Sequence, residues 1–200
     1  MDADLPYAGL VLTTYGLTDR EFPLTRMRAF LAWLAEFCAV NPDRLKGVAT
    51  IALQDVDVAI REVRRAVEEL KHVAVMMPTN VMDRDIGHKD FWPFYEEVER
   101  LGIPLALHGG INAATRAHGR FDKFISVHTV SFPFECMMAL VGLVFAGVPE
   151  KFPKMKIAVL EGCIGWLPFL MDRMDEEFEK QGWRDAPLLT RKPSEYLASD

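Results

Sequence analysis

The feature that most constrains this chain is a series of short apolar runs separated by longer amphipathic stretches. Five such runs occur, at residues 9–15, 47–53, 72–78, 104–110 and 155–162. Their apolar positions are continuous rather than alternating, which is typical of strands that are buried on both faces of a parallel sheet. The runs therefore predict five strands covered by helices.

The stretches between the predicted strands have helical periodicity, because their apolar residues recur every three or four positions. The predicted helices are residues 23–40, 56–70, 90–102, 133–146 and 167–180. The fourth is expected to begin with Ser131 as its cap and Pro133 in its first turn. Residues 111–131 show no period, so we expect an irregular segment before that helix.

The alternating order of strands and helices predicts one α/β domain. Right-handed crossovers between parallel strands lead either to an open sheet or to a barrel. No glycine-rich GxGxxG or GxxxxGK[ST] loop follows any predicted strand, which argues against dinucleotide and P-loop folds. A (β/α) barrel is therefore the favoured architecture, with its chemistry at the carboxyl ends of the strands.

Composition excludes several classes of function. The chain has 200 residues, a formal net charge of −6 and no basic cluster, so nucleic acid is not an expected partner. No uninterrupted apolar run approaches the roughly 18 residues of a membrane span, so no membrane partner is expected either. Cys38, Cys136 and Cys163 form no CxxC pair and the amino-terminal residues do not resemble a signal peptide, which favours a cytoplasmic location.

Two polar side chains come at the ends of predicted strands. His108 ends the run PLALHGG and is followed by two glycines, which let a ligand or another backbone approach closely. An imidazole there can bind a divalent metal or transfer protons near neutral pH, although a histidine bonded inside the core is the alternative. Glu161 ends the run MKIAVLEG, where a carboxylate can bind metal, accept a proton or orient a histidine.

The other histidines are weaker candidates. His128 precedes the predicted fourth helix, so it either points toward the strand ends or caps that helix. His72 begins a predicted strand and is expected at the opposite, amino end of the sheet. His88 and His118 lie in polar stretches and are expected to be solvated.

Four segments together resemble a known family. They are residues 41–66, 104–110, 146–174 and 191–197. They are similar to the decarboxylase-like branch of the metal-dependent amidohydrolase superfamily, which includes aminocarboxymuconate-semialdehyde and resorcylate decarboxylases. The similarity follows the family order along nearly the whole chain.

The resemblance implies a TIM (β/α)₈ barrel that holds a divalent metal, with zinc as the expected ion. In the family the ligands are an HxH pair on the first strand, a histidine on the fifth and an aspartate on the eighth; His108 falls on the fifth-strand position. The 200 residues contain no HxH pair, and Glu161 stands where decarboxylases have a sixth-strand histidine. Residues 1–200 are thus expected to be a partial barrel, truncated at both ends and covering about strands two to six.

The implied function is a metal-dependent enzyme with a small-molecule substrate. It either hydrolyses a C–X bond or decarboxylates a small carboxylate, and the missing sixth-strand histidine favours hydrolysis slightly. Glu161 is expected to act as a base or to support the metal, and His128 to contact the substrate. The alternative is a non-catalytic barrel that serves as a binding or scaffold protein and has lost its metal site.

The incomplete barrel has two further consequences for the isolated chain. Exposed sheet edges would allow it to form a homo-oligomer. One histidine and one carboxylate are fewer than the three protein ligands of catalytic zinc, so we expect weak zinc binding and no turnover.

Overall fold

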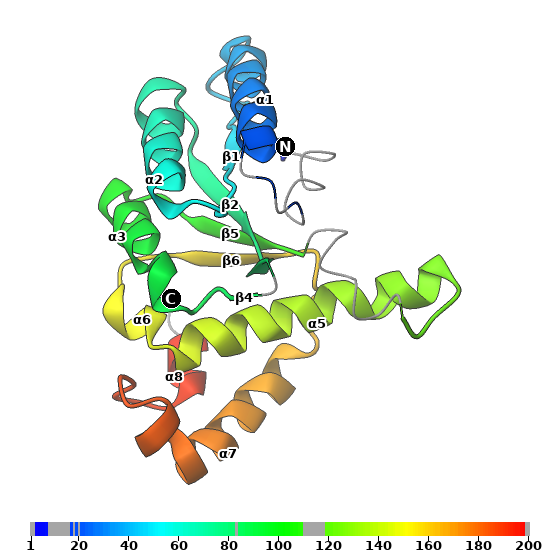
Figure 1. The fold of residues 1–200 in the computed structure, drawn as a ribbon, viewed down its shortest axis with the longest axis vertical. Helices are drawn as coiled ribbons and strands as arrows, with labels where there is room; N and C mark the ends of the chain where they lie inside the picture. Colours follow the sequence, from blue (N-terminus) through cyan, green and yellow to red (C-terminus); the bar gives the residue numbers. More distant parts are fainter. Residues whose placement is uncertain are drawn as a thin grey trace.

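A four-stranded parallel sheet forms the centre of the molecule in the computed structural model, which describes residues 3–7, 17, 19, 21–82, 84–109 and 119–198. Its order is β1–β2–β5–β6 (Figure 1). The strands are β1 (Val48–Thr50), β2 (Ala74–Pro78), β5 (Leu105–His108) and β6 (Ile157–Leu160). Four predicted strands are confirmed, and the run at residues 9–15 lies outside the described residues.

The register of the strands brings their carboxyl ends to one edge of the sheet. Pro78 of β2 pairs with His108 of β5, and His108 pairs with Leu160 of β6. Glu161 follows Leu160 directly, so both predicted site residues reach this edge. We call it the carboxyl edge.

Helices follow the strands in the predicted order. They are α1 (Glu21–Ala39), α2 (Val56–Arg64), α3 (Trp92–Leu101), α5 (Phe124–Phe145), α6 (Val148–Lys151), α7 (Leu167–Asp185) and α8 (Pro193–Leu197). A π-helical turn, Arg65–Glu69, extends α2, and a 3₁₀ turn, Lys89–Phe91, precedes α3. The Asp55 carboxylate accepts a hydrogen bond from the Val58 N–H at the start of α2, while Gly102 ends α3 with a φ of 67°.

Helix α5 corrects the sequence prediction. It begins at Phe124 rather than near Ser131, so Ser131 is not its cap and Pro133 lies inside the helix. The hydroxyls of Thr129 and Ser131 donate to carbonyls four residues earlier, those of Ile125 and Val127. Such local bonds satisfy helix carbonyls, and the predominance of apolar and hydroxyl residues left no amphipathic period to detect.

Length and composition give α5 another property that the sequence did not predict. Within the described part of the chain, α5 is the one helix long and apolar enough to cross a membrane, although half of its apolar window is buried inside the protein. Polar residues interrupt it, which is why no continuous apolar run was visible. Ala139 and Leu143 pack in the main core, while Leu140 and Val144 pack against α7, as expected of a core helix.

Both faces of the sheet are buried, as the continuous apolar runs predicted. One face packs against α2, α3 and α5 through residues that include Ala49, Val75, Leu105 and Leu107. The opposite face carries a smaller cluster of Val48, Ala74, Met76 and Ala106. Strand β6 differs, because Ala158 is exposed and β6 has no second neighbour among the described strands.

A two-stranded antiparallel hairpin, β3 (Asn80–Val81) with β4 (Arg84–Asp85), follows β2 and was not predicted.

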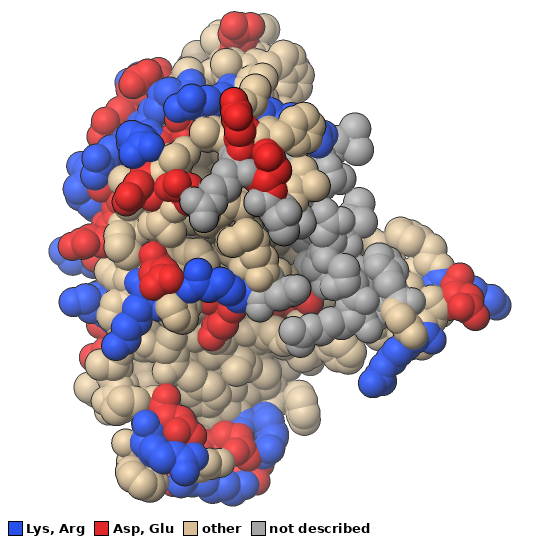
Figure 2. Space-filling view, viewed as in Figure 1, with Lys and Arg blue, Asp and Glu red and all other residues tan. Residues whose placement is uncertain are grey.

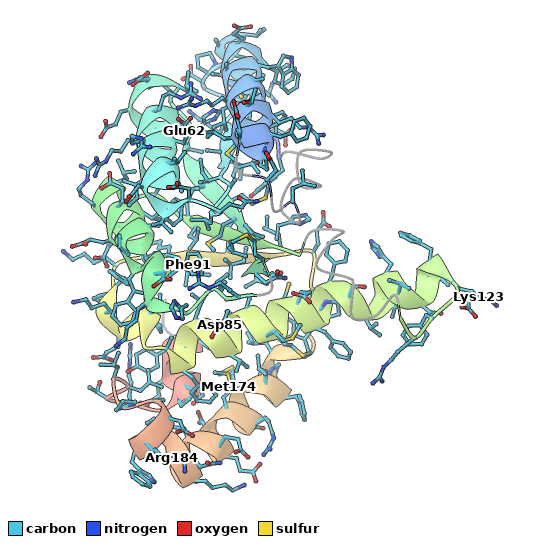
Figure 3. The ribbon with its side chains drawn as sticks, viewed as in Figure 1. Glu62, Asp85, Phe91, Lys123, Met174 and Arg184 are labelled. Atoms are coloured by element: carbon cyan, nitrogen blue, oxygen red, sulfur yellow. The ribbon has the colours of Figure 1, made fainter. Side chains whose placement is uncertain are left out.

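Charged side chains gather over α2 and α3 and again over α7, whereas the surface near the middle of α5 is largely uncharged (Figure 2). The amino-terminal half of α5 projects past the sheet, with Lys123 at its far end (Figure 3).

Candidate functional site

His108 and Glu161 meet at the carboxyl edge. The His108 Nε2 atom lies 3.4 Å from Glu161 Oε2. The histidine side chain is 8% exposed and the carboxylate is 62% exposed. The predicted convergence of these two residues is therefore confirmed, with an imidazole held in the protein and a carboxylate that reaches it from solvent.

The hydrogen bonding of His108 defines what its Nε2 atom can do. Its Nδ1 atom lies 3.0 Å from the Gly109 carbonyl oxygen, which can only accept, so Nδ1 carries the proton and donates. In the neutral imidazole Nε2 then presents a lone pair toward the Glu161 carboxylate. Two electron-rich groups repel at this distance unless a proton held by either group, or a metal ion, lies between them.

The geometry of the pair suits one half of a metal site. Two ligands on one tetrahedral ion, with bonds of about 2.0–2.2 Å, lie roughly 3.4 Å apart. Within residues 3–7, 17, 19, 21–82, 84–109 and 119–198, however, no group of three or more His, Cys, Asp and Glu side chains is placed to hold a metal. The donor set of the described residues fits a divalent ion in kind but does not complete its coordination.

An unusual backbone turn orients Glu161. Glu161 and Cys163 have positive φ angles of 60° and 55°, a conformation that side chains other than glycine rarely adopt. Gly162 between them is tightly packed, since a Cβ atom there would lie 2.9 Å from Cys136 Sγ. Such conformations persist where the surroundings impose them and are frequent at functional sites.

Glu135 and Cys136 of α5, which sequence reasoning missed, contact residues at the ends of the strands near the His108–Glu161 pair. Glu135 is 6% exposed, and its Oε2 atom accepts hydrogen bonds from Thr79 Oγ1 at 3.2 Å and Asn80 Nδ2 at 3.0 Å. Burial, together with the negative charges of Glu135 and Glu161, raises the pKa of the Cys136 thiol to about 11. Cys136 is therefore a protonated packing residue. The sequence signal that could have identified Glu135 is a carboxylate inside an otherwise apolar helical stretch.

His128 lies on α5 and does not cap it, so the capping alternative is wrong. Its exposed ring is 4.8 Å from the Phe132 ring, measured between centroids, and the Phe132 ring is 5.8 Å from that of His108. His128 is thus linked to the histidine–carboxylate pair through one intervening ring.

The remaining histidines follow the sequence predictions where the structure describes them. His72 is buried at the amino end of the sheet, with Nε2 3.2 Å from the Leu31 carbonyl oxygen, and burial lowers its pKa. His88 is half exposed and accepts a hydrogen bond from the Asp90 N–H. His118 lies outside the described residues.

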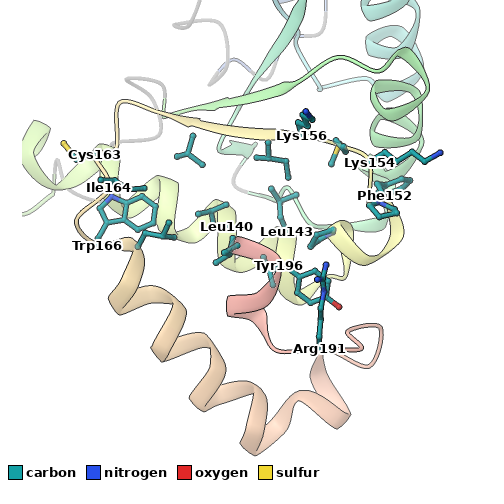
Figure 4. A pocket seen from close by; sticks show the side chains of 18 residues that line it. Leu140, Leu143, Phe152, Lys154, Lys156, Cys163, Ile164, Trp166, Arg191 and Tyr196 are labelled. Carbon is teal, nitrogen blue, oxygen red and sulfur yellow. The ribbon is translucent and has the colours of Figure 1, made fainter. Parts of the chain in front are cut away.

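A large open groove of about 740 Å³ runs along β6 (Figure 4). Apolar residues form most of its lining, and they include Val159 of β6, Leu143 of α5 and Tyr196 of α8. Cys163 and Ile164 close one end near the turn that orients Glu161. We place the chemistry at the carboxyl edge and not in this groove, because neither His108 nor Glu161 lines it.

Comparison with known families identifies the fold to which this site belongs. A family model described as amidohydrolase matches residues 12–198. This chain belongs to the amidohydrolase family. The predicted resemblance is confirmed, and His108 lies in the part of this amidohydrolase-family chain that the match covers.

Two curated relatives of this chain are decarboxylases. Gamma-resorcylate decarboxylase of Rhodococcus jostii (strain RHA1) is 31% identical over 183 residues, which cover 86% of this chain and 54% of that protein. The 2-amino-3-carboxymuconate-6-semialdehyde decarboxylase of Dictyostelium discoideum is 25% identical over 164 residues, covering 82% of this chain and 45% of the relative. The chain thus spans about half the length of these relatives.

Solved structures agree on the fold. The 5-carboxyvanillate decarboxylase of Sphingomonas paucimobilis superposes with a TM-score of 0.79 at 24% identity, covering 96% of this chain and 56% of that one. A dihydroxybenzoic acid decarboxylase from Polaromonas sp. JS666, solved with manganese and the inhibitor 2-nitroresorcinol, gives 0.70 at 26% identity, covering 88% and 55%. These neighbours confirm a TIM-barrel type of α/β fold.

Proposed function

We propose that this chain carries part of the active site of a metal-dependent decarboxylase that acts on an aromatic carboxylate. The observation that carries the proposal is the His108–Glu161 pair, 3.4 Å apart at the carboxyl edge of a parallel sheet. The decarboxylase activities of the relatives support decarboxylation over the hydrolysis that the sequence slightly favoured.

His108 is proposed as a ligand of a divalent metal through Nε2. The hydrogen bond from Nδ1 to the Gly109 carbonyl fixes the ring so that the Nε2 lone pair faces the carboxyl edge. A bound divalent ion supplies positive charge that holds the anionic groups of the substrate and withdraws electron density from it. Manganese is bound in the Polaromonas neighbour, whereas zinc remains the prediction from the sequence.

Glu161 is proposed to transfer the proton that decarboxylation requires. In its protonated form it donates a proton to the ring carbon that bears the carboxylate. The bond between that carbon and the carboxylate then breaks, CO₂ leaves, and the electron pair returns to the ring. The product keeps the donated proton, and the ionised Glu161, which is 62% exposed, regains one from solvent.

We further propose that residues 1–200 form part of a larger barrel that is truncated at both ends. Three observations support this: the span of about half of each relative, the incomplete donor set among the residues that the structure describes, and the apolar groove beside β6. The remaining ligands would then come from outside these residues. Homo-oligomer formation and a cytoplasmic location stay predictions.

The test uses the whole gene product that contains this chain, loaded with Mn²⁺ or with Zn²⁺. Incubation with 2,6-dihydroxybenzoate and with 5-carboxyvanillate is expected to release CO₂ and, in D₂O, to leave one deuterium on the carbon that lost the carboxylate. E161Q is expected to lower kcat by about 10²- to 10⁴-fold, because general acid–base groups contribute on that order. E69Q, an exposed carboxylate at the end of the π-helical turn, is the matched control.

Two outcomes would contradict the proposal. A hydrolytic product without CO₂ release would favour the hydrolase alternative. Absence of both turnover and stoichiometric metal would favour the non-catalytic barrel that binds a partner or acts as a scaffold.

A further inference from the structure

One turn of α5, residues 132–136, contacts the carboxyl ends of β2, β5 and β6, and we call it the contact turn. Its link to β2 is Glu135, whose Oε2 atom accepts hydrogen bonds from Thr79 Oγ1 at 3.2 Å and from Asn80 Nδ2 at 3.0 Å. Thr79 directly follows the last residue of β2. The carboxylate therefore joins α5 to the chain at the point where β2 ends.

Phe132 links the contact turn to the end of β5. Its ring meets that of His108 edge to face, with the centroids 5.8 Å apart and 80° between the ring planes. A Cβ atom on Gly109 would lie 3.4 Å from Phe132 Cδ1 and 3.7 Å from Glu135 Cβ, so the contact turn packs on the backbone of this segment as well as on the imidazole. The orientation of the His108 ring thus depends on where the contact turn lies.

Cys136 links the contact turn to the end of β6. Its Sγ atom lies 3.7 Å from the carbonyl oxygen of Leu160, the residue before Glu161. Gly162, the residue after Glu161, is packed so closely that a Cβ atom there would lie 2.9 Å from the same sulfur. A shift of α5 would therefore move the backbone that carries the Glu161 carboxylate.

We propose that Glu135 is a positioning residue for the metal site. By binding the end of β2 it fixes the contact turn, and the contact turn keeps His108 and Glu161 at the spacing that one metal ion requires. This inference rests on the proposed function for the role of that pair. Glu135 itself touches neither His108 Nε2 nor the Glu161 carboxylate among the printed contacts of the pair, so it acts through the contact turn.

The chemistry of the contact explains why a polar group serves at this point of an apolar helix. Glu135 is 6% exposed and Thr79 is 3% exposed, so breaking their bond leaves buried polar groups that water does not reach. A hydrogen bond also fixes a distance and a direction, whereas apolar burial is non-directional. The two bonds of Glu135 thus define the position of α5 against β2 more closely than apolar packing alone.

The experiment measures metal binding by the whole gene product, so it does not depend on turnover. Calorimetry with Mn²⁺ compares the unmodified protein with E135A, which is expected to bind Mn²⁺ about 10- to 100-fold more weakly, the range for groups that orient metal ligands. E135Q keeps an oxygen that can accept both bonds and is expected to recover most of the affinity. Equal losses in E135A and E135Q would overturn the inference.

A control variant separates positioning from general stability. Leu143 lies about two turns further along α5, is 1% exposed and packs in the main core. L143A leaves a cavity and is expected to lower the melting temperature without changing Mn²⁺ affinity. If E135A and L143A weaken Mn²⁺ binding in proportion to the melting temperature that each loses, the role of Glu135 is only structural.

The same contact can be removed from the side of β2. T79V with N80A deletes both donors and is expected to weaken Mn²⁺ binding as E135A does, which also supplies the test if E135A fails to fold. Adding E135A to this pair is expected to cause little further loss, because both changes remove one interaction. Fully additive losses would contradict the inference.

A readout without metal distinguishes this inference from the proposed function. Cys136 is fully buried under the contact turn, so its alkylation by iodoacetamide, followed by peptide mass spectrometry, is expected to be faster in E135A than in L143A. Faster alkylation with normal metal affinity in H108Q would reject the metal site while Glu135 still fixes the contact turn. Weak metal binding in H108Q with unchanged binding and alkylation in E135A would retain the site and reject the role of Glu135.

Discussion

Two buried histidines at opposite ends of the sheet show how differently this protein uses the same side chain. His72 precedes β2 at the amino end and is 3% exposed, while His108 ends β5 at the carboxyl edge and is 6% exposed. Both have backbone carbonyl partners, Leu31 for His72 and Gly109 for His108. Only His108 has a carboxylate opposite its second ring nitrogen.

The neighbouring glycines differ in the same way. A Cβ atom on Gly47 would lie 2.3 Å from His72 Nδ1, whereas one on Gly109 would lie 3.4 Å from the nearest ring atom of Phe132, an ordinary contact. The amino end is therefore tightly packed around its histidine, whereas the backbone beside His108 would accept a methyl group at ordinary contact distances. In barrels of this type the strand carboxyl ends hold the chemistry and the opposite end contributes stability.

The largest expected effect separates the two histidines by metal binding. In the whole gene product H108Q is expected to weaken Mn²⁺ and Zn²⁺ affinity at least about 100-fold, because even groups that only orient a ligand are worth 10- to 100-fold. H72Q, at the other end of the sheet, is the control and should bind metal normally. Calorimetric titration measures both, and equal metal affinities would remove the proposed role of His108.

The two glycines provide the next test. G47A is expected to lower the free energy of unfolding by about 1–3 kcal/mol, since its methyl group would overlap the His72 ring. G109A places its methyl group in ordinary contact distance and is expected to cost less. Urea unfolding measures the unfolding free energy of both variants. A larger decrease in G109A than in G47A would contradict the conclusion that the amino end is the more tightly packed one.

Acidification is expected to weaken the amino end through His72. Burial holds the folded-state pKa of His72 below its usual value of 6.5, so the unfolded chain binds the proton more readily. Stability is then present above pH 6.5 and falls as the pH drops through that value. H72Q keeps an N–H donor without titrating, so its unfolding free energy should fall less than that of the unmodified chain between pH 7.5 and 5.5; parallel curves would contradict this.

The smallest effect is expected in the outer helical layer. Hydrogen bonds from Arg64 and Arg100 lower the pKa of Glu97 to about 2, from an ordinary 4.5. Its contribution is present above pH 4.5 and is lost as the pH falls toward 2, well below the window of His72. Both guanidinium groups are about half exposed, which limits the gain. E97Q should change the slope of unfolding free energy against pH only between about pH 4.5 and 2, and a changed slope between pH 7.5 and 5.5 would refute the separation.

Much of the fold could be predicted because buried strands and helices have characteristic apolar patterns over short stretches of sequence. Continuous apolar runs located β1, β2, β5 and β6, and periodic stretches located α1, α2, α3 and α7. The beginning of α5 was missed because its first turns lack an alternation of apolar and charged faces. Their polar side chains include hydroxyl groups that donate to carbonyls within the helix. The hairpin of β3 and β4 was missed because strands of two residues carry too little pattern to detect.

The candidate site could be predicted only in part. Strand-end positions identified His108 and Glu161, but Glu135 was hidden inside an apolar helix and its partners Thr79 and Asn80 come from the end of β2. The contacts of the Phe132 ring with His108 and His128 were also invisible in the sequence, since His128 lies in a segment that was expected to be irregular. Contacts of this kind depend on how elements pack and leave no periodic signal.

The sequence by itself determined the order and type of the main elements and placed His108 and Glu161 at the ends of strands, because backbone preferences and hydrophobic periodicity act over neighbouring residues. The tertiary structure decided that these two side chains face each other at 3.4 Å, that a turn with positive φ at Glu161 orients the carboxylate, and that α5 brings the Phe132 ring to His108. Those outcomes join residues far apart in the chain. They are set by strand register and side-chain packing, which no short stretch of sequence encodes alone.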